Sequence, residues 1–288
     1  MQNSTVKNYF SLIKFSHTIF ALPFALTGYF LAIEYSSYTF NWTLLLKVVL
    51  CMVFTRNAAM AFNRYIDRDI DKANERTAEV REIPNGAIKA KSALIFVIIN
   101  CVLFIATTYF INSICFYLSP IALLVVLGYS YTKRFTALCH LVLGIGLSLA
   151  PIGAYLAVTG SFAWLPLYFS FAVLFWVAGF DMIYSLQDEE FDKKMSLHSI
   201  PSKIGKSATL KLSVVFHIIT AIFLLYAAYQ SNANIYFWIG CLLFIGLLIY
   251  QHLLVKPNDL SKVNIAFFTT NGIASLIFSI FVILSFYL

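Results

Sequence analysis

The sequence predicts an all-α, polytopic membrane protein with nine transmembrane helices. Of its 288 residues, 60 % are hydrophobic and only 11 % are charged, and the mean hydropathy is +0.82. Soluble domains carry about 25 % charged residues, so this composition excludes an ordinary soluble fold. Two further observations agree with it: nine apolar segments are long enough to cross a bilayer, and the loops between them alternate in charge.

Each predicted span approaches the roughly 20 residues that a helix needs to cross the hydrocarbon core. The first segment is too long for the apolar core of a cleavable signal peptide, so we interpret it as a span. The third and fourth are separated only by Asn112 and Ser113. The nine spans cover residues 17–35, 42–62, 93–112, 114–131, 138–158, 162–184, 210–230, 235–255 and 265–287.

The loops fall into two classes that alternate along the chain. Four short loops, around residues 36–41, 112–113, 159–161 and 231–234, contain no Lys or Arg. The N-terminal segment and the other loops carry basic residues, which the positive-inside rule places in the cytoplasm. We therefore expect a multi-pass protein of the inner membrane with a cytoplasmic N-terminus. The net charge of +7 then reflects orientation and anionic lipid, and no nucleic-acid partner is expected.

The acidic residues show a second pattern that membrane orientation does not require. Eleven of the thirteen Asp and Glu residues fall into two clusters, one after the second span and one at the end of the sixth. The first contains Asp67, Asp69, Asp71, Glu75, Glu79 and Glu82, and the second contains Asp181, Asp188, Glu189, Glu190 and Asp192. Two such clusters on one membrane face indicate a site.

Helical spacing predicts that each cluster presents an acidic stripe. Asn63, Asp67 and Asp71 are four residues apart, so they share one face of a helix. Tyr184, Asp188 and Asp192 follow Asp181 by three, seven and eleven residues, which places the three carboxylates near one line.

Two facing acidic stripes favour a cation between them. Mg²⁺ prefers oxygen ligands and is usually held by one or two carboxylates together with substrate phosphates. Basic side chains nearby can bind the remaining phosphate oxygens. The chain offers Arg64, Arg68, Lys133, Arg134, Lys193 and Lys194 for this purpose. The pattern predicts an Mg²⁺-bridged diphosphate with a lipid tail.

Four stretches together resemble the UbiA superfamily of intramembrane prenyltransferases, in its quinone-biosynthesis branch. They are "NRYIDRDID" (63–71), "ERTAEVREIPNG" (75–86), "YSYTKRFT" (129–136) and "DMIYSLQDEEFDKK" (181–194). The resemblance covers the whole chain. It implies one prenyltransferase domain over residues 1–288, with its helices around a central cavity open to the cytoplasm and Asp-rich loops at about 63–92 and 185–209.

The resemblance also implies roles for individual residues. The metal-binding positions are Asn63, Asp67, Asp71, Asp181, Asp188 and Asp192, of which Asp67, Asp71, Asp181 and Asp188 are expected to be catalytic. The substrate and diphosphate contacts are Arg56, Asn63, Arg64, Lys133, Arg134, Tyr184, Lys194 and Lys14. Arg64 departs from the family, which has an acid there. His140, early in the fifth span, is either a core histidine or a functional one.

The implied reaction is Mg²⁺-dependent transfer of a polyprenyl group from a polyprenyl diphosphate to a small aromatic acid in ubiquinone or menaquinone biosynthesis. 4-Hydroxybenzoate is the leading acceptor, and a dihydroxynaphthoate is the alternative. A cation-coupled transporter is the alternative from another class. Transporters usually place ionisable groups near the membrane midplane between repeated halves, whereas these acids lie at helix ends.

Overall fold

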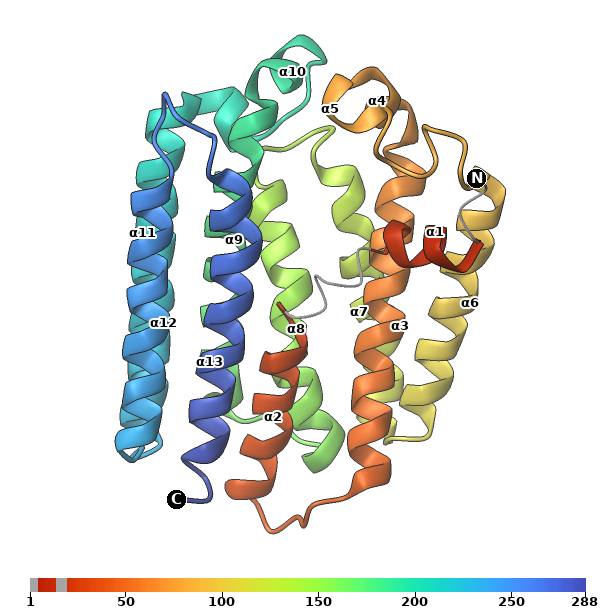
Figure 1. The fold of residues 1–288 in the computed structure, drawn as a ribbon. Helices are drawn as coiled ribbons and strands as arrows, with labels where there is room; N and C mark the ends of the chain where they lie inside the picture. The colour runs from red at the N-terminus through yellow and green to blue at the C-terminus, as the bar shows by residue number, and fades with distance from the viewer. Residues whose placement is uncertain (1–4, 14–19) are drawn as a thin grey trace.

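The computed structural model describes residues 5–13 and 20–288, and its described part is an all-α bundle (Figure 1). Eight of its helices are long and apolar enough to span a membrane. They are α3 (Trp42–Ile66), α6 (Ala90–Tyr109), α7 (Ser113–Thr132), α8 (Cys139–Thr159), α9 (Trp164–Ser185) with its extension, α11 (Ile200–Gln230), α12 (Ile235–Leu254) and α13 (Asn271–Leu284) with the preceding turn. The predicted polytopic all-α class is confirmed.

The first predicted span is shorter than expected. Helix α2 (Leu22–Glu34) has 13 residues, and Pro23 lies in its first turn, where a missing N–H costs nothing. A separate short helix, α1 (Thr5–Leu12), precedes it and lies across the bundle (Figure 1). Residues 14–19, which include Lys14, lie outside the described residues.

Asparagines define the tight turns at the uncharged end of the bundle. Asn41, Asn112 and Asn234 each precede a helix and accept a hydrogen bond from a backbone N–H of its first turn. Asn112 also donates to the carbonyl oxygens of Leu156 and Ala157 at the end of α8. Asn112 therefore binds backbone groups at the start of α7 and at the end of α8 that have no partner within their own helix. These bonds hold the short turn between α6 and α7 against the end of α8.

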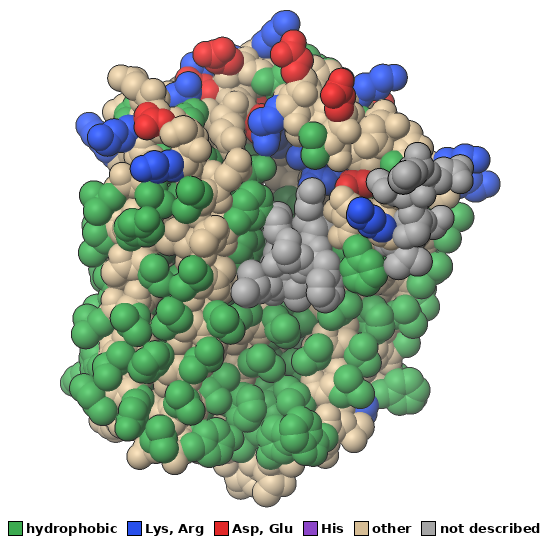
Figure 2. Space-filling model, viewed as in Figure 1, with side chains coloured by type: hydrophobic (Ala, Val, Ile, Leu, Met, Phe, Trp, Pro, Cys, Tyr) green, Lys and Arg blue, Asp and Glu red, His purple; other side chains and the backbone are tan. Residues whose placement is uncertain are grey.

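The opposite end of the bundle carries the charged segments. Helix α3 continues into α4 (Arg68–Ala73) and α5 (Glu75–Ala78), and α9 continues through a 3-10 turn (Leu186–Asp188) into α10 (Glu189–Lys194). Figure 2 shows charged side chains gathered at this end and hydrophobic ones covering the sides below. Sequence clusters about 120 residues apart thus meet at one end of the molecule, as Figure 1 also shows.

Aromatic side chains fill the core between α2, α9, α12 and α13. Four of these side chains are each at most 1 % exposed: Phe24, Trp176, Phe244 and Phe278. The centroids of their contacting rings are at most 6.3 Å apart. Such ring contacts add to the burial of their large surfaces. This packed region supports the inner part of α9, whose outer end carries the second acidic cluster.

Gly144 allows α8 to approach α9, and we expect Gly144→Ala to destabilise the protein by about 1–3 kcal/mol. A methyl group there would overlap the carbonyl oxygen of Leu174, and a backbone atom cannot move aside alone. Gly153→Ala on the same helix is the matched control, because nothing lies within 4 Å of its new methyl group. Thermal unfolding of both variants in detergent measures the difference, and equal melting temperatures would contradict the packing argument.

Candidate active site

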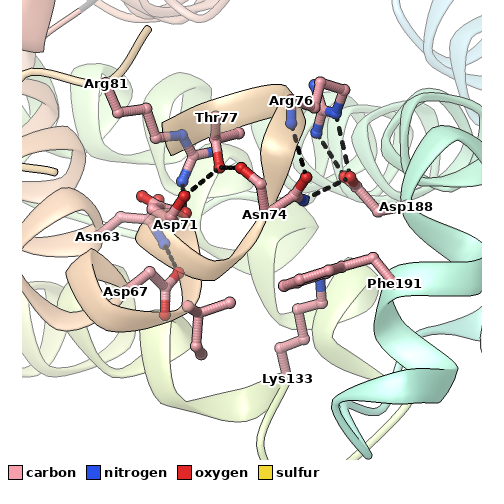
Figure 3. A pocket seen from close by; sticks show the side chains of 11 residues that line it. Asn63, Asp67, Asp71, Asn74, Arg76, Thr77, Arg81, Lys133, Asp188 and Phe191 are labelled. Atoms are coloured by element: carbon pink, nitrogen blue, oxygen red, sulfur yellow. Dashed lines mark hydrogen bonds and ion pairs between the residues drawn. The ribbon is translucent and has the colours of Figure 1, made fainter. Parts of the chain in front are cut away.

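A pocket opens at the charged end, between α3, α4 and α5 on one side and the α9–α10 extension on the other (Figure 3). It holds about 400 Å³ of empty space, part of it open to solvent. Its lining is mostly polar and comes from three stretches of the chain, 63–81, 133 and 188–191: Asn63, Asp67, Ile70, Asp71, Asn74, Arg76, Thr77, Arg81, Lys133, Asp188 and Phe191. Carboxylates and cations therefore share one concave surface.

The first motif lies together on one wall of this pocket. Helix α3 ends at Ile66, Asp67 is its C-cap, and α4 carries Asp71. The amide nitrogen of Asn63 donates to Asp67 Oδ2 at 2.9 Å. All three members of the predicted stripe, Asn63, Asp67 and Asp71, line the pocket, while Asp69 is 85 % exposed beside Arg68.

The side chain of Asp71 is buried, and only one of its two carboxylate oxygens accepts a hydrogen bond from the described part of the chain. Its Oδ1 accepts from the Arg81 guanidinium, whereas its Oδ2 is buried with no hydrogen-bond partner among the described residues. The Thr77 hydroxyl donates to the backbone carbonyl of Asp71 and fixes the turn that follows α4. A buried carboxylate oxygen without a donor is costly unless a cation or another donor binds it.

Arg76 links the first segment to the second acidic cluster, 112 residues away. Its guanidinium makes two hydrogen bonds to Asp188, from Nε to Oδ1 at 3.1 Å and from the terminal nitrogen to Oδ2 at 2.5 Å. Asn74 also donates to Asp188 Oδ1, at 3.1 Å, and Arg76 donates to the Tyr184 hydroxyl at 3.2 Å. Figure 3 shows the hydrogen bonds from Arg76 and Asn74 to Asp188.

Two further cations come from the segment between α7 and α8. Lys133 Nζ lies 2.6 Å from Asp192 Oδ1, and Arg134 lies 2.8 Å from Asp67 Oδ1. Arg134 also donates to the backbone carbonyls of Ser130 and Ile66, so its position is fixed by α3 and α7 together. The predicted basic pair therefore meets both acidic clusters.

Four carboxylates are thus paired with four cations across the pocket. Burial raises the pKa of the Asp67 carboxyl above its ordinary value, although the Arg134 charge acts in the opposite direction. Burial alone would lower the pKa of Arg76, but its hydrogen bonds and charge attraction to Asp188 outweigh burial and raise it. The site therefore offers both carboxylates and cations, and these groups can bind a ligand that carries a cation and an anion together.

The second acidic stripe is not continuous in the structure, which corrects the expected alignment. The 3-10 turn interrupts the α-helical repeat after Ser185, so the three carboxylates meet different partners. Asp188 lines the pocket, Asp192 is fully buried against Lys133, and Asp181 lies 2.7 Å from His140 Nδ1. His140 Nε2 accepts from the backbone N–H of Ile200, so in its neutral form the ring donates to Asp181 through Nδ1.

The remaining predicted contacts lie outside the pocket lining. Arg64 is 7 % exposed, and its guanidinium donates to Asn63 Oδ1 at 3.4 Å, with Asp71 and Glu82 close enough to interact with its charge. Arg56 donates to the carbonyl oxygen of Ile13 at 3.0 Å. Lys194 is exposed beyond Asp192 on α10. The roles expected for these residues stay predictions.

Sequence reasoning missed Arg76, Arg81 and Asn74 as individual site residues. The signal was present, because "ERTAEVREIPNG" was one of the matching stretches and contains both arginines. Helical spacing could not find them, since α5 ends at Ala78 and Arg81 follows in irregular chain. Their side chains reach the pocket only because the chain folds back over the end of α3.

A metal can be accommodated by the oxygen atoms of this pocket together with a phosphate ligand. Among residues 5–13 and 20–288, no three His, Cys, Asp or Glu side chains converge closely enough to hold a metal by themselves. Mg²⁺ does not require such a cage, because it usually binds one or two carboxylates and completes its shell with phosphate oxygens and water. The unpartnered Asp71 Oδ2 and the neighbouring Asp67 and Asn63 oxygens fit that chemistry.

Comparison with known sequences identifies related proteins over most of the chain. The model of the UbiA prenyltransferase family matches residues 21–273. A protein of Aliivibrio fischeri (strain MJ11) named 4-hydroxybenzoate octaprenyltransferase is 30 % identical over 83 % of this chain and 82 % of its own. One of Vesicomyosocius okutanii with the same name is 31 % identical over 82 % of this chain and 85 % of its own.

Solved structures show the same fold. A UbiA homologue from Aeropyrum pernix K1 superposes with a TM-score of 0.84 and 30 % sequence identity, covering 93 % of this chain and 97 % of that chain. A UbiA homologue from Archaeoglobus fulgidus, solved with GPP and Mg²⁺ bound, gives a TM-score of 0.74 at 22 % identity, covering 98 % of this chain and all of that chain. At that identity the second likeness concerns the fold alone.

Proposed function

Because this chain belongs to the UbiA prenyltransferase family, we propose that it transfers a polyprenyl group from a polyprenyl diphosphate to 4-hydroxybenzoate in a quinone pathway. The observation that carries the proposal is the convergence of Asp67, Asp71 and Asp188 with three cations on one pocket at the charged end of the bundle, with a fourth cation, Arg134, paired to Asp67 beside it. The names of the two 30–31 % identical relatives support the acceptor.

Mg²⁺ is the proposed cofactor, and it would be held by Asn63, Asp67 and Asp71 from one side and Asp188 from the other. When bound, it neutralises negative charge that develops on the leaving diphosphate. Asp192 and Asp181, which the family resemblance also implies as ligands, support this site in the proposal. Asp192 holds Lys133 in place, and Asp181 is held by His140.

The basic residues of the pocket bind the diphosphate in this proposal. Arg76, Arg81, Lys133 and Arg134 are paired with carboxylates in the structure, and a bound diphosphate offers each of them more oxygen acceptors. Charge-assisted hydrogen bonds of this kind are about twice as strong as neutral ones, and arginine can make them in pairs. They stabilise the leaving group more as its charge grows.

The chemical step breaks the C1–O bond of the prenyl diphosphate, and both electrons leave with the diphosphate oxygen. The allylic C1 then accepts an electron pair from a ring carbon of the acceptor, and the ring carbon loses its proton to a base. Aromatic side chains can stabilise the allylic cation, and a membrane-embedded bundle excludes the water that would capture it.

The proposed orientation places the pocket at the cytoplasmic surface of the inner membrane. The basic loops lie at the same end of the bundle as the pocket, and the short loops without Lys or Arg lie at the other end. The positive-inside rule supports that placement. Water-soluble aromatic acid and Mg²⁺ would enter from the cytoplasm, while the prenyl chain lies in the bilayer.

A product assay tests the proposal. Purified protein in lipid vesicles receives geranyl diphosphate, Mg²⁺ and an equal mixture of 4-hydroxybenzoate and a dihydroxynaphthoate. We expect prenylated 4-hydroxybenzoate as the main product and none in the presence of EDTA. Prenylation of the naphthoate alone would refute the acceptor but not the enzyme class, and absence of any Mg²⁺-dependent prenylated product would refute both.

A further inference from the structure

The last membrane helix begins with a π-helical turn, Ile265–Thr270, which contacts Tyr184 of the second acidic segment. π-Helical turns are rare, because the extra residue weakens the regular hydrogen bonding of the helix. Where they occur, they are often at functional sites. Here the sequence "IAFFTT" places two phenylalanines, Phe267 and Phe268, in that turn. A feature that costs helix stability at this place calls for a reason.

Buried polar side chains hold the π-helical turn in place. Gln251 of α12 donates to the carbonyl oxygen of Ala266 at 3.0 Å, and Asn271 donates to the carbonyl oxygens of Ala266 and Phe267 at 3.1 and 2.9 Å. Trp176 of α9 donates to Asn271 Oδ1 at 2.9 Å. Gln251, Asn271 and Trp176 are all fully buried, so three helices fix this one turn.

The turn presents Phe267 to the ring of Tyr184. Their centroids are 4.2 Å apart with an interplanar angle of 33°, and Phe267 also meets Phe180 edge-on at 5.2 Å. Phe268 contacts Tyr184 as well, with centroids 5.9 Å apart, so two consecutive residues reach the same ring. Phe267 is 9 % exposed, so its ring is buried within the bundle and is not part of the lipid-facing surface.

Tyr184 joins this aromatic group to the pocket. It lies about one helical turn further into the bundle than Asp188, and its hydroxyl accepts from Arg76. The Arg76 guanidinium also lies over the Tyr184 ring, 5.4 Å from its centroid. The ring therefore interacts with a cation in this structure while Phe267 packs against it.

We propose that Phe267, held by the π-helical turn, is a positioning residue that fixes the ring of Tyr184 beside C1 of the bound prenyl diphosphate. C1 is bonded to the diphosphate, so it must lie next to the phosphate-binding residues, on the side from which the chain enters the bundle. Tyr184 contacts one of these residues, Arg76, through both its hydroxyl and its ring. Its ring stabilises the allylic cation and keeps water from C1 while the acceptor attacks. This inference rests on the proposed prenyl transfer.

Phe267→Leu tests the inference, with Phe244→Leu as the matched control. Phe244 is fully buried among aromatic rings of the same bundle, and its recorded ring contacts are with Phe24, Trp176 and Phe278. Both substitutions remove one buried ring. We expect Phe267→Leu to lower kcat for prenyl transfer about 10-fold, in line with the strength of a partly desolvated cation–π contact. Mg²⁺-dependent binding of geranyl diphosphate should change less than about 3-fold, because the charged contacts remain.

The product ratio separates positioning from general damage. Water that reaches C1 bonds to it and loses a proton, giving the prenyl alcohol and diphosphate. Phe267→Leu should raise the ratio of prenyl alcohol to prenylated acid at least several-fold, whereas Phe244→Leu should leave it unchanged. Gln251→Met, which loses the hydrogen bond to Ala266 at similar volume, should shift the ratio in the same direction as Phe267→Leu.

Equal kcat and equal product ratios in the two leucine variants would overturn the role of Phe267 while leaving the enzyme class intact. A wild-type protein that forms no prenylated acid would instead overturn the proposed function, and this inference with it. If Phe267→Leu loses geranyl diphosphate binding to the same extent as kcat, its role is structural support of the pocket and the positioning role is refuted.

Discussion

Asp67→Asn is expected to lower prenyl transfer by about 10³-fold, and Asp188→Asn by a similar factor. The two residues come from opposite walls of the pocket, and each substitution keeps the shape of the side chain while it removes the negative charge. Each carboxylate acts on the negative diphosphate through the metal, and loss of electrostatic stabilisation of such a developing charge typically costs about 10²–10³ in kcat. Loss of a metal ligand also weakens Mg²⁺ binding, which brings the total to about 10³ or more. Initial rates over a range of Mg²⁺ concentrations measure both effects.

Asp69→Asn is the matched control for these variants. Asp69 lies two residues from both Asp67 and Asp71, but its side chain is 85 % exposed and lies 3.8 Å from Arg68, outside the pocket. An exposed pair of this kind contributes little to stability. Its activity and Mg²⁺ dependence should match the wild type within about 2-fold, since a surface substitution away from a site changes little. Near-normal turnover in Asp67→Asn would refute the metal assignment.

The spans of this protein were predictable because membrane helices depend on composition more than on partners. Only helices or closed barrels satisfy the backbone within a bilayer, so a long apolar segment has few alternatives. The weakest separation, between the third and fourth spans, was confirmed: α6 ends at Tyr109 and α7 begins at Ser113. The sequence could not foresee the early start of α11 at Ile200, because Ser199 caps a short helical segment that bends at Gly205.

The first motif was easier to predict than the second. Asn63, Asp67 and Asp71 follow the helix repeat almost without a break, so spacing alone places them on one wall. In the second cluster a 3-10 turn falls between Tyr184 and Asp192 and changes the direction of each side chain. No local residue signals that turn. The cations that pair with Asp188 and Asp192, which are Arg76 and Lys133, are far away in sequence.

Arg64 is the position at which the first motif departs from the family pattern, and its expected phosphate contact stays a prediction. The sequence suggests a phosphate contact, because a basic residue replaces an acid within the motif. Arg64 does not line the pocket, but it lies directly behind it: its guanidinium donates to Asn63 Oδ1 at 3.4 Å, and its charge interacts with Arg81 and Asp71, which do line the pocket. Adjacent residues of a helix point about 100° apart, so Asn63 lines the pocket while the neighbouring Arg64 does not.

The second large effect is expected at Arg76, which bridges the two acidic clusters. Arg76→Met should reduce kcat/KM for the prenyl diphosphate by about 10²-fold or more, because it removes a fork of two charged hydrogen bonds that the diphosphate would use. It should also lower stability by about 1–3 kcal/mol, since Asp188 is only 13 % exposed and would lose its cation. Steady-state kinetics and thermal unfolding in the same detergent measure the two losses.

The double exchange Arg76→Asp with Asp188→Arg separates a structural bridge from a substrate contact. A salt bridge can form again with its charges reversed, so the exchange should recover part of the stability that Arg76→Met loses. Prenyl transfer should stay at the level of the single variants, because the diphosphate would meet a carboxylate at position 76 and the metal would meet a cation at position 188. If the exchange restored activity together with the melting temperature, Arg76 and Asp188 would only hold the two halves of the pocket together, and the phosphate and metal roles would have to be assigned to Arg81, Lys133 and the first motif.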